Sequence, residues 1–181
     1  YASIDFGAVL VNRLTEYALQ YTDYDYATAD MMVVERGNYV AAHSYKADHT
    51  LKGSYIDLYD ASLPVRVNPT VPRDDSFVGF CVTDMDRSIP RLGFTSGNVK
   101  DGSVHEESGK MTYTVTSAGN TVLANRILLP DGVYPQKITI QRGNKQLTIL
   151  EYTYDKDTHS CMFRFDGSMT EATIEITFGK G

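Results

Sequence analysis

Short runs in which apolar and polar residues alternate constrain this chain more than any other feature of its sequence. Met111 to Thr116, Lys137 to Gln141 and Ala172 to Phe178 each carry an apolar side chain at every second position. Successive side chains point to opposite faces of a β-strand, so each run predicts a strand with one buried and one solvated face. The thirteen tyrosines and the frequent Thr, Val and Ile residues suit such half-buried strands.

Turn-forming residues separate the strand candidates. Gly and Asn occur in Ser117 to Asn120, in Arg142 to Lys145 and in Arg36 to Asn38, and both tolerate the positive φ that tight hairpins need. Phe77 to Val82 is apolar on both faces, which predicts a central strand covered on both sides. The prolines fall between strand candidates or at their ends, where a missing N–H interrupts no ladder.

These patterns predict an all-β fold, an antiparallel β-sandwich that is Ig-like or jelly-roll-like, with one N-terminal helix. The helix is expected over Ile4 to Gln20, where Phe6, Leu10 and Leu14 recur at helical spacing. We therefore divide the chain in two. We expect residues 1–30 to form the helix and a Tyr-rich connection that packs on the sandwich or on a missing neighbour, and residues 31–181 to form the sandwich domain. An alternative places a domain boundary near residues 96–110, where Ser96 to Asn98 and Lys100 to Ser103 are rich in turn-forming residues.

The net charge of the chain limits the classes of molecule that it is expected to bind. Seventeen Lys and Arg residues against twenty-three Asp and Glu residues give a formal net charge of -6, which argues against nucleic acid as a partner. No run reaches the roughly 18 to 20 apolar residues of a membrane-spanning helix, and no signal-peptide pattern opens the chain. Because the chain begins at Tyr1, we interpret it as a processed or excised part of a longer protein.

The strongest candidate binding surface combines tyrosines with interleaved carboxylates. Tyrosine rings pack on the C–H faces of sugars, and carboxylates accept hydrogen bonds from sugar hydroxyls. The same residues also suit a protein contact, because aromatic side chains are enriched at interfaces. The predicted ligand-binding residues are Tyr21, Asp23, Tyr24, Asp25 and Tyr26.

Other polar groups favour structural roles. Acid pairs such as Asp84 and Asp86 lie in predicted turns, where Asp bonds nearby backbone amides. Calcium at Asp23 and Asp25 with Asp30 stays open, although this loop lacks the Gly and final Glu of an EF-hand. The four histidines lack zinc-ligand spacing and are interpreted as structural. We predict no catalytic residue, no metal site and no cofactor.

The two cysteines leave two interpretations. Cys81 and Cys161 both lie in apolar strand candidates and fit buried thiols that behave as small hydrophobic residues. A disulfide between them would close a long loop and stabilise the fold in an oxidising compartment.

Two stretches carry a resemblance to a known group of proteins. Arg36 to His43 with Leu51 to Asp60 resembles the C-terminal β-rich region of large secreted bacterial proteins that act on glycans. Pro135 to Gln141, Tyr152 to Asp155 and Phe163 to Ile176 are similar to the closing β-sandwich of many glycoside hydrolases. In those proteins such regions brace a catalytic domain or bind carbohydrate. No position here matches a catalytic motif, so the resemblance implies no catalytic residue.

The resemblance implies a non-catalytic accessory β-sandwich domain of a larger, exported carbohydrate-active protein. It would contact other domains of the same parent protein, with glycan as a candidate ligand, in the periplasm, at the cell surface or outside the cell. One alternative is a purely structural module for protein–protein interaction. Another is a small independent enzyme that acts on glycans with paired carboxylates, for example Asp84 and Asp86.

Overall fold

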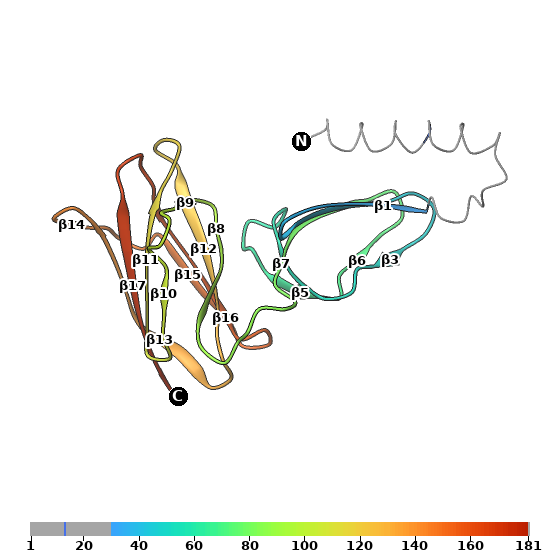
Figure 1. Ribbon diagram of the computed structural model, residues 1–181. Helices are drawn as coiled ribbons and strands as arrows, with labels where there is room; N and C mark the ends of the chain where they lie inside the picture. The colour runs from blue at the N-terminus through green and yellow to red at the C-terminus, as the bar shows by residue number, and fades with distance from the viewer. Residues whose placement is uncertain (1–12, 14–29, 181) are drawn as a thin grey trace. The chain divides into compact units, whose positions relative to one another are not determined.

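The computed structural model describes residue 13 and residues 30–180 (Figure 1). Every regular element between residues 30 and 180 is a β-strand, and every strand pair is antiparallel, so the predicted all-β class is confirmed. The helix predicted over Ile4 to Gln20 lies outside the described residues, except for Arg13. The chain divides into two compact units between Thr83 and Asp84.

The first unit contains a five-stranded sheet and a two-stranded sheet. The strand order of the larger sheet is β1-β2-β7-β4-β5, and β3 pairs with β6 in the smaller one. The strands are β1 (Met31–Arg36), β2 (Tyr39–Ser44), β3 (His49–Thr50), β4 (Ser54–Asp57), β5 (Val65–Val67), β6 (Thr70–Val71) and β7 (Ser76–Cys81). Strand β7 lies at the centre of its sheet, as its apolar sequence predicts, but it is not covered on both sides, since Phe77 is buried and Val78 and Phe80 are only partly buried.

The predicted hairpin at Arg36 to Asn38 is confirmed. Arg36 pairs with Tyr39, so Gly37 and Asn38 form a two-residue loop between β1 and β2. Gly37 has a φ of 58°, which a residue without a Cβ adopts at little cost. The Asn38 side-chain amide donates to the Cys81 carbonyl at 3.0 Å, and the Cys81 N–H donates to the Asn38 carbonyl at 2.7 Å. These two bonds tie the turn to the end of β7.

One face of the five-stranded sheet packs against the smaller sheet. Side chains of directly paired residues in antiparallel strands lie on the same face, and the pairing of Ala42 with Phe77 places both on the inner face. Val71 of β6 is fully buried against this face. The Tyr55 and Phe77 rings meet edge to face, with their centroids 5.9 Å apart. The members of this core cluster therefore lie on one side of the sheet, although Ile56 and Val65 on the other side are also buried.

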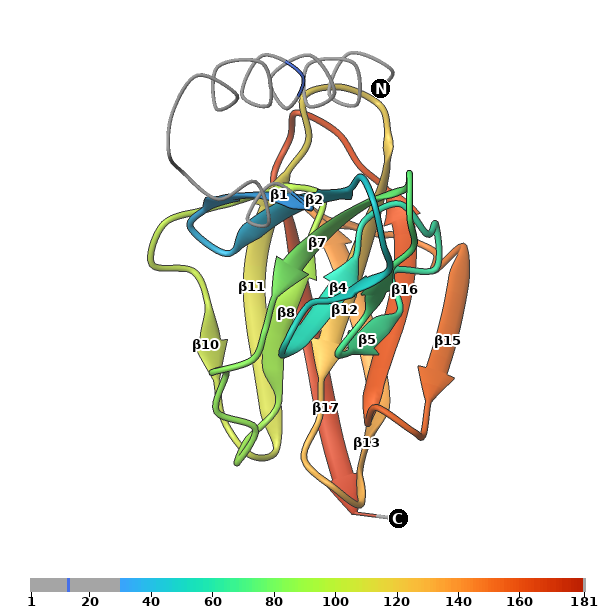
Figure 2. The ribbon, with the colours of Figure 1, turned by 90° about the vertical axis from the view of Figure 1, so that its right-hand side faces the viewer.

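The second unit contains two larger sheets. One has the strand order β10-β11-β17-β13-β14 with β9 also paired to β11, and the other has the order β15-β16-β12-β8. Figure 2 shows β8, β12, β16 and β15 as neighbours in the second of these. The strands are β8 (Arg91–Thr95), β9 (Asn98–Val99), β10 (His105–Glu106), β11 (Lys110–Thr116), β12 (Val122–Leu128), β13 (Val133–Arg142), β14 (Lys145–Gln146), β15 (Glu151–Asp155), β16 (Ser160–Asp166) and β17 (Ala172–Lys180).

The two sheets of this unit enclose a single hydrophobic core, which makes the unit sandwich-like. Alternate residues of β11 and β17 face inward from one sheet, and alternate residues of β12 and β16 face inward from the other. The alternation predicted from the sequence is thus confirmed. The fully buried members include Met111, Tyr113, Val115, Ile127, Cys161, Phe163, Phe165, Ile174 and Ile176.

One buried hydrogen bond joins the two sheets across this core. The Tyr113 hydroxyl on β11 donates to the Asn125 side-chain oxygen on β12 at 3.0 Å, and both residues are 0% exposed. Burial raises the pKa of Tyr113 well above its usual range, so the hydroxyl keeps its proton as a donor.

The division into two units differs from the expected single sandwich over residues 31–181. It also falls before the alternative boundary within residues 96–110. The reason is strand pairing: β1 to β7 pair only with one another, and β8 to β17 pair only with one another. Ser96 and Gly97 connect β8 to β9 within the second unit, and the change of pairing partners falls after Thr83.

Pro135 departs from the expected placement of the prolines. It lies inside β13 rather than at its end, opposite Phe178 of β17. The register shifts between Pro135 and Lys137, and a bulge of this kind accommodates a residue that cannot donate to the ladder.

Replacing Gly79 with Ala tests the packing of the first core. A Cβ at Gly79 would lie 2.5 Å from the Phe77 ring and 3.2 Å from the Tyr55 Cβ. Because the Phe77 ring is buried, we expect Gly79→Ala to lower the free energy of unfolding by about 1–3 kcal/mol. Chemical denaturation would measure this, with Gly119→Ala as the control, since nothing lies within 4 Å of a Cβ there. Equal stability of the two variants would contradict the packing.

Replacing Tyr113 with Phe tests the bond between the two sheets of the second unit. The variant keeps the ring but leaves the buried Asn125 oxygen without its donor, which should lower the free energy of unfolding by about 1–3 kcal/mol. Tyr152→Phe is the matched control, because Tyr152 is 45% exposed. A Tyr113→Phe variant as stable as the control would show that the bond contributes nothing to the fold.

Candidate functional site

The binding residues predicted from the sequence lie outside the described part of the chain. Tyr21, Asp23, Tyr24, Asp25 and Tyr26 all fall within residues 14–29. The structure therefore leaves this prediction untested.

The third acid of the calcium alternative, Asp30, is described. Its carboxylate lies 3.5 Å from the Lys46 amine, and its carbonyl accepts a hydrogen bond from Tyr45. Between residues 30 and 180, no group of three or more His, Cys, Asp or Glu side chains could hold a metal ion.

The described acid pairs shape turns, as the sequence predicts. Asp86 accepts hydrogen bonds from the backbone and the hydroxyl of Ser88, each at 2.8 Å, and these bonds with Arg91 lower the pKa of its carboxyl. Asp155 accepts from the backbone of Asp157 at 2.9 Å and from the Thr158 hydroxyl at 2.7 Å. Each carboxylate therefore stabilises a turn by accepting hydrogen bonds from residues that follow it closely in the chain.

Two of the histidines, His43 and His159, have polar side-chain contacts. His43 is buried on β2, and its Nδ1 lies 2.8 Å from the Ser76 hydroxyl of β7. His159 has a φ of 46° and follows the turn after β15, and its Nε2 lies 3.6 Å from an Asp131 carboxylate oxygen. The His43–Ser76 pair lies on two neighbouring strands of one sheet.

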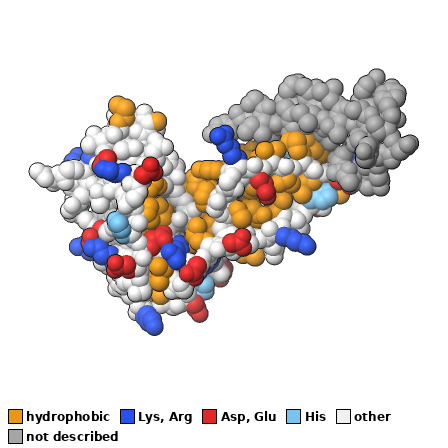
Figure 3. Space-filling model, in the orientation of Figure 1, with side chains coloured by type: hydrophobic (Ala, Val, Ile, Leu, Met, Phe, Trp, Pro, Cys, Tyr) orange, Lys and Arg blue, Asp and Glu red, His pale blue; other side chains and the backbone are white. Residues whose placement is uncertain are grey.

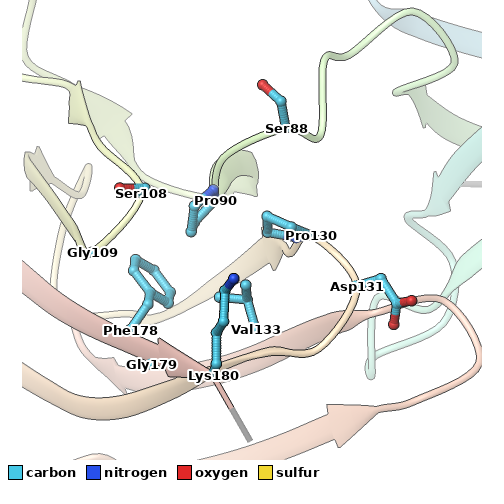
Figure 4. Close-up of a pocket in the computed structure, with 10 residues that line it drawn as sticks. All are labelled: Ser88, Pro90, Ser108, Gly109, Pro130, Asp131, Val133, Phe178, Gly179 and Lys180. Atoms are coloured by element: carbon cyan, nitrogen blue, oxygen red, sulfur yellow. The ribbon is translucent and has the colours of Figure 1, made fainter.

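A cavity of about 470 Å³ in the second unit is the best candidate site. We call it the Phe178 cavity. The segment before β8, the β10–β11 turn, the β12–β13 turn and the end of β17 all reach it (Figure 4). Its lining residues are Ser88, Pro90, Ser108, Gly109, Pro130, Asp131, Val133, Phe178, Gly179 and Lys180.

Backbone hydrogen bonds hold these segments in place. The Phe178 N–H donates to the Gly109 carbonyl at 2.9 Å, which joins β17 to the β10–β11 turn. The Val133 N–H donates to the Pro130 carbonyl at 3.2 Å and closes the β12–β13 turn, in which Gly132 has a φ of 68°. Val133 also pairs with Lys180. The cavity is therefore built on sheet ends rather than on a free loop.

The lining combines an apolar surface with a few polar groups. Pro130 and Val133 are the partly exposed apolar residues of the lining, whereas Pro90 is buried and the Phe178 side chain is only 9% exposed. Figure 4 shows the Lys180 amine directed toward Pro130, with the Asp131 carboxylate at the other end of the site from Phe178. Such a lining suits a ligand with both C–H surface and hydroxyl groups.

A second cavity of about 350 Å³ lies in the first unit. Its charged groups already contact one another, since Arg66 lies 3.5 Å from a carboxylate oxygen of Asp57 and 3.4 Å from one of Asp60. Asp57 also accepts a hydrogen bond from the Tyr59 backbone at 3.0 Å. These groups serve the local structure, so the cavity is a weaker candidate than the one at Phe178.

Sequence reasoning did not single out the residues of the Phe178 cavity. Pro130, Asp131 and Gly132 carry only a turn signal, and Lys180 follows the last apolar residue of the alternating run that ends at Phe178. They come together because β13 and β17 are antiparallel neighbours, and the start of β13 at Val133 pairs with the end of β17 at Lys180. That pairing joins residues more than forty positions apart and leaves no local signal.

The structure contains Cys81 and Cys161 as free thiols. Burial raises the pKa of Cys161 to about 12, so almost no reactive thiolate forms near neutral pH. We expect an alkylating reagent at pH 8 to label Cys81, which is partly exposed, and to label Cys161 only after denaturation. Mass spectrometry of the labelled peptides would check this. Rapid labelling of both thiols in the native protein, or of neither until a reductant is added, would contradict it.

In the described part of the chain, no helix has the length and apolar character that crossing a membrane requires. Comparisons of the chain with protein-family models, curated proteins and solved structures found no match. Residue roles are therefore inferred from the chain's own geometry.

Proposed function

We propose that this chain is a non-catalytic accessory β-sandwich domain of a larger, exported carbohydrate-active protein, and that it contacts glycan at the Phe178 cavity. The observation that carries the proposal is the lining of this cavity, where hydroxyl, ammonium and carboxylate groups border an apolar surface. Sugar rings present C–H groups on their faces and hydroxyls around their edges, so both parts of the lining have a counterpart in the ligand.

The scaffold supports a binding role. Loops held at the end of a rigid sheet structure are common positions for ligand contacts. The jelly-roll-like version of the sandwich fits the pairing best, because β11 pairs with β17 while β12 pairs with β16 in the opposite sheet. This nested pairing brings the start of β13 beside the end of β17, where the cavity lies.

The charges suggest the class of glycan. Asp131 can accept hydrogen bonds from sugar hydroxyls, and the Lys180 amine can donate them. The net charge of -6 disfavours polyanionic glycans, so neutral oligosaccharides are the proposed ligands. Because the Phe178 ring is mostly buried, we expect weak binding, with a Kd of about 1 mM, or about −4 kcal/mol.

Titration of the chain with a panel of neutral oligosaccharides, followed by NMR, tests the proposal. Asp131→Ala and Lys180→Ala should each weaken binding by removing a hydrogen-bonding group from the cavity. Asp101→Ala and Lys145→Ala are matched controls, since both residues are exposed and neither lines the cavity. The proposal fails if no neutral glycan binds, or if binding is the same in all four variants.

The assignment to a larger carbohydrate-active protein has a separate test. The gene that encodes this chain should also encode a glycosidase or lyase domain in the same reading frame. A reading frame without any such domain would remove the accessory role, even if the Phe178 cavity binds sugar.

A second candidate function is a structural module for protein–protein interaction. The observation that favours it lies in the first unit, where Val34 and Val67 are more than half exposed on a sheet. An interaction module would keep its partner when Lys180 is replaced, and would lose it when the exposed apolar residues of the first unit are replaced.

A further inference from the structure

The five-stranded sheet of the first unit has one face covered by the smaller sheet and an opposite face that is partly exposed, since Ile56 and Val65 on that opposite face are 0% and 6% exposed. Val34 pairs with Ala41, and Ala41 pairs with Val78, so these three side chains share the face opposite the first core. Tyr39 and Phe80 are paired on the same side, and their rings lie edge to face with centroids 5.1 Å apart. We call this side the outer face. Its apolar residues are Met32, Val34, Tyr39, Ala41, Ile56, Val65, Val67, Val78 and Phe80.

Several apolar residues of the outer face are exposed to solvent. The exposed fractions are 54% for Val34, 51% for Tyr39 and 63% for Val67. Val78 and Phe80 of the central strand are only partly buried, although the run that contains them is apolar on both sides. Figure 3 shows exposed hydrophobic side chains gathered on this unit. An apolar surface of this kind on a soluble domain indicates a contact.

The outer face has few charged groups that would lose their hydration when an apolar surface binds. Among its described members, Arg36 is the charged one. Its polar pair, His43 and Ser76, is joined by the 2.8 Å contact between the ring and the hydroxyl. Binding an apolar surface here therefore desolvates few unpaired polar groups.

We propose that residues 4–20 of the same chain pack on the outer face through their apolar stripe. The sequence predicts that Phe6, Leu10, Leu14, Tyr17 and Ala18 lie on one side of a helix. A helix of this length would span about 25 Å at 1.5 Å per residue. The six-residue strands β1, β2 and β7, which carry most of the exposed part of the outer face, are each about 20 Å long at roughly 3.3 Å per residue. The two apolar surfaces thus match in size.

The connection to β1 favours this occupant over a separate molecule. Residues 19–30 lie between the stripe and Met31, which begins the edge strand of the sheet. Twelve residues can extend to about 40 Å at roughly 3.3 Å each, which is enough to reach any part of the outer face. A segment tethered so closely has an effective concentration of about millimolar or more, so it competes well against a partner in solution.

Hydroxyl-radical footprinting of the full chain tests the proposal. Tyr39 is 51% exposed and Tyr59, in the same unit, is 46% exposed. If residues 4–20 cover the outer face, Tyr39 should be oxidised several-fold more slowly than Tyr59. Leu10→Asp with Leu14→Asp should bring the oxidation of Tyr39 up to that of Tyr59. Tyr59 reports in the same sample whether the unit remains folded.

The matched control is Asn12→Asp, which adds a charge on the polar side of the predicted stripe and should leave Tyr39 protected. Equal oxidation of Tyr39 and Tyr59 in the unmodified chain would overturn the proposal. Protection that survives the Leu10 and Leu14 substitutions would also overturn it. Protection that appears only at high protein concentration would assign the outer face to a second copy of the chain and reject the tethered segment.

Discussion

The joint burial of two alternating strand faces is the constraint on which the second unit depends. Exposure of Phe163 and Phe165 of one sheet, or of Ile174 of the other, to water would be unfavourable. Each sheet therefore supplies the apolar surface that buries the other. The bond between Tyr113 and Asn125 fixes how the two faces meet, because a buried polar pair tolerates few alternative alignments. With the sheets held in this register, the start of β13 lies beside the end of β17, and both contribute residues to the Phe178 cavity.

In the first unit, the apolar faces of the larger sheet are not fully buried. Its small second sheet contributes Val71 and covers only the inner face of the larger sheet. The outer face, with Val34 and Val67 exposed, needs a further layer to complete the usual two-sided burial of an apolar sheet. The two units therefore have different roles in our account: one presents a small polar and apolar cavity, and the other presents an apolar face.

Local sequence patterns predicted the strands and a hairpin turn, but not which strands far apart in the sequence pair with one another. The alternation in β11 and β17 and the Gly37-Asn38 turn are encoded within a few residues, so sequence reasoning found them. The boundary after Thr83 depends on which strands pair, and pairing joins residues far apart in the sequence. The Phe178 cavity was missed for the same reason, since Pro90, Asp131 and Lys180 come from three distant segments. The predicted site around Tyr24 lies outside the described residues.

Contacts between glycan and the Phe178 cavity are the central functional claim, and intermolecular nuclear Overhauser effects measure them most directly. With a neutral oligosaccharide bound, our account predicts effects from sugar protons to the Val133 methyl groups and to the edge of the Phe178 ring. Effects confined to tyrosines elsewhere in the chain, with none at Val133 or Phe178, would contradict the account.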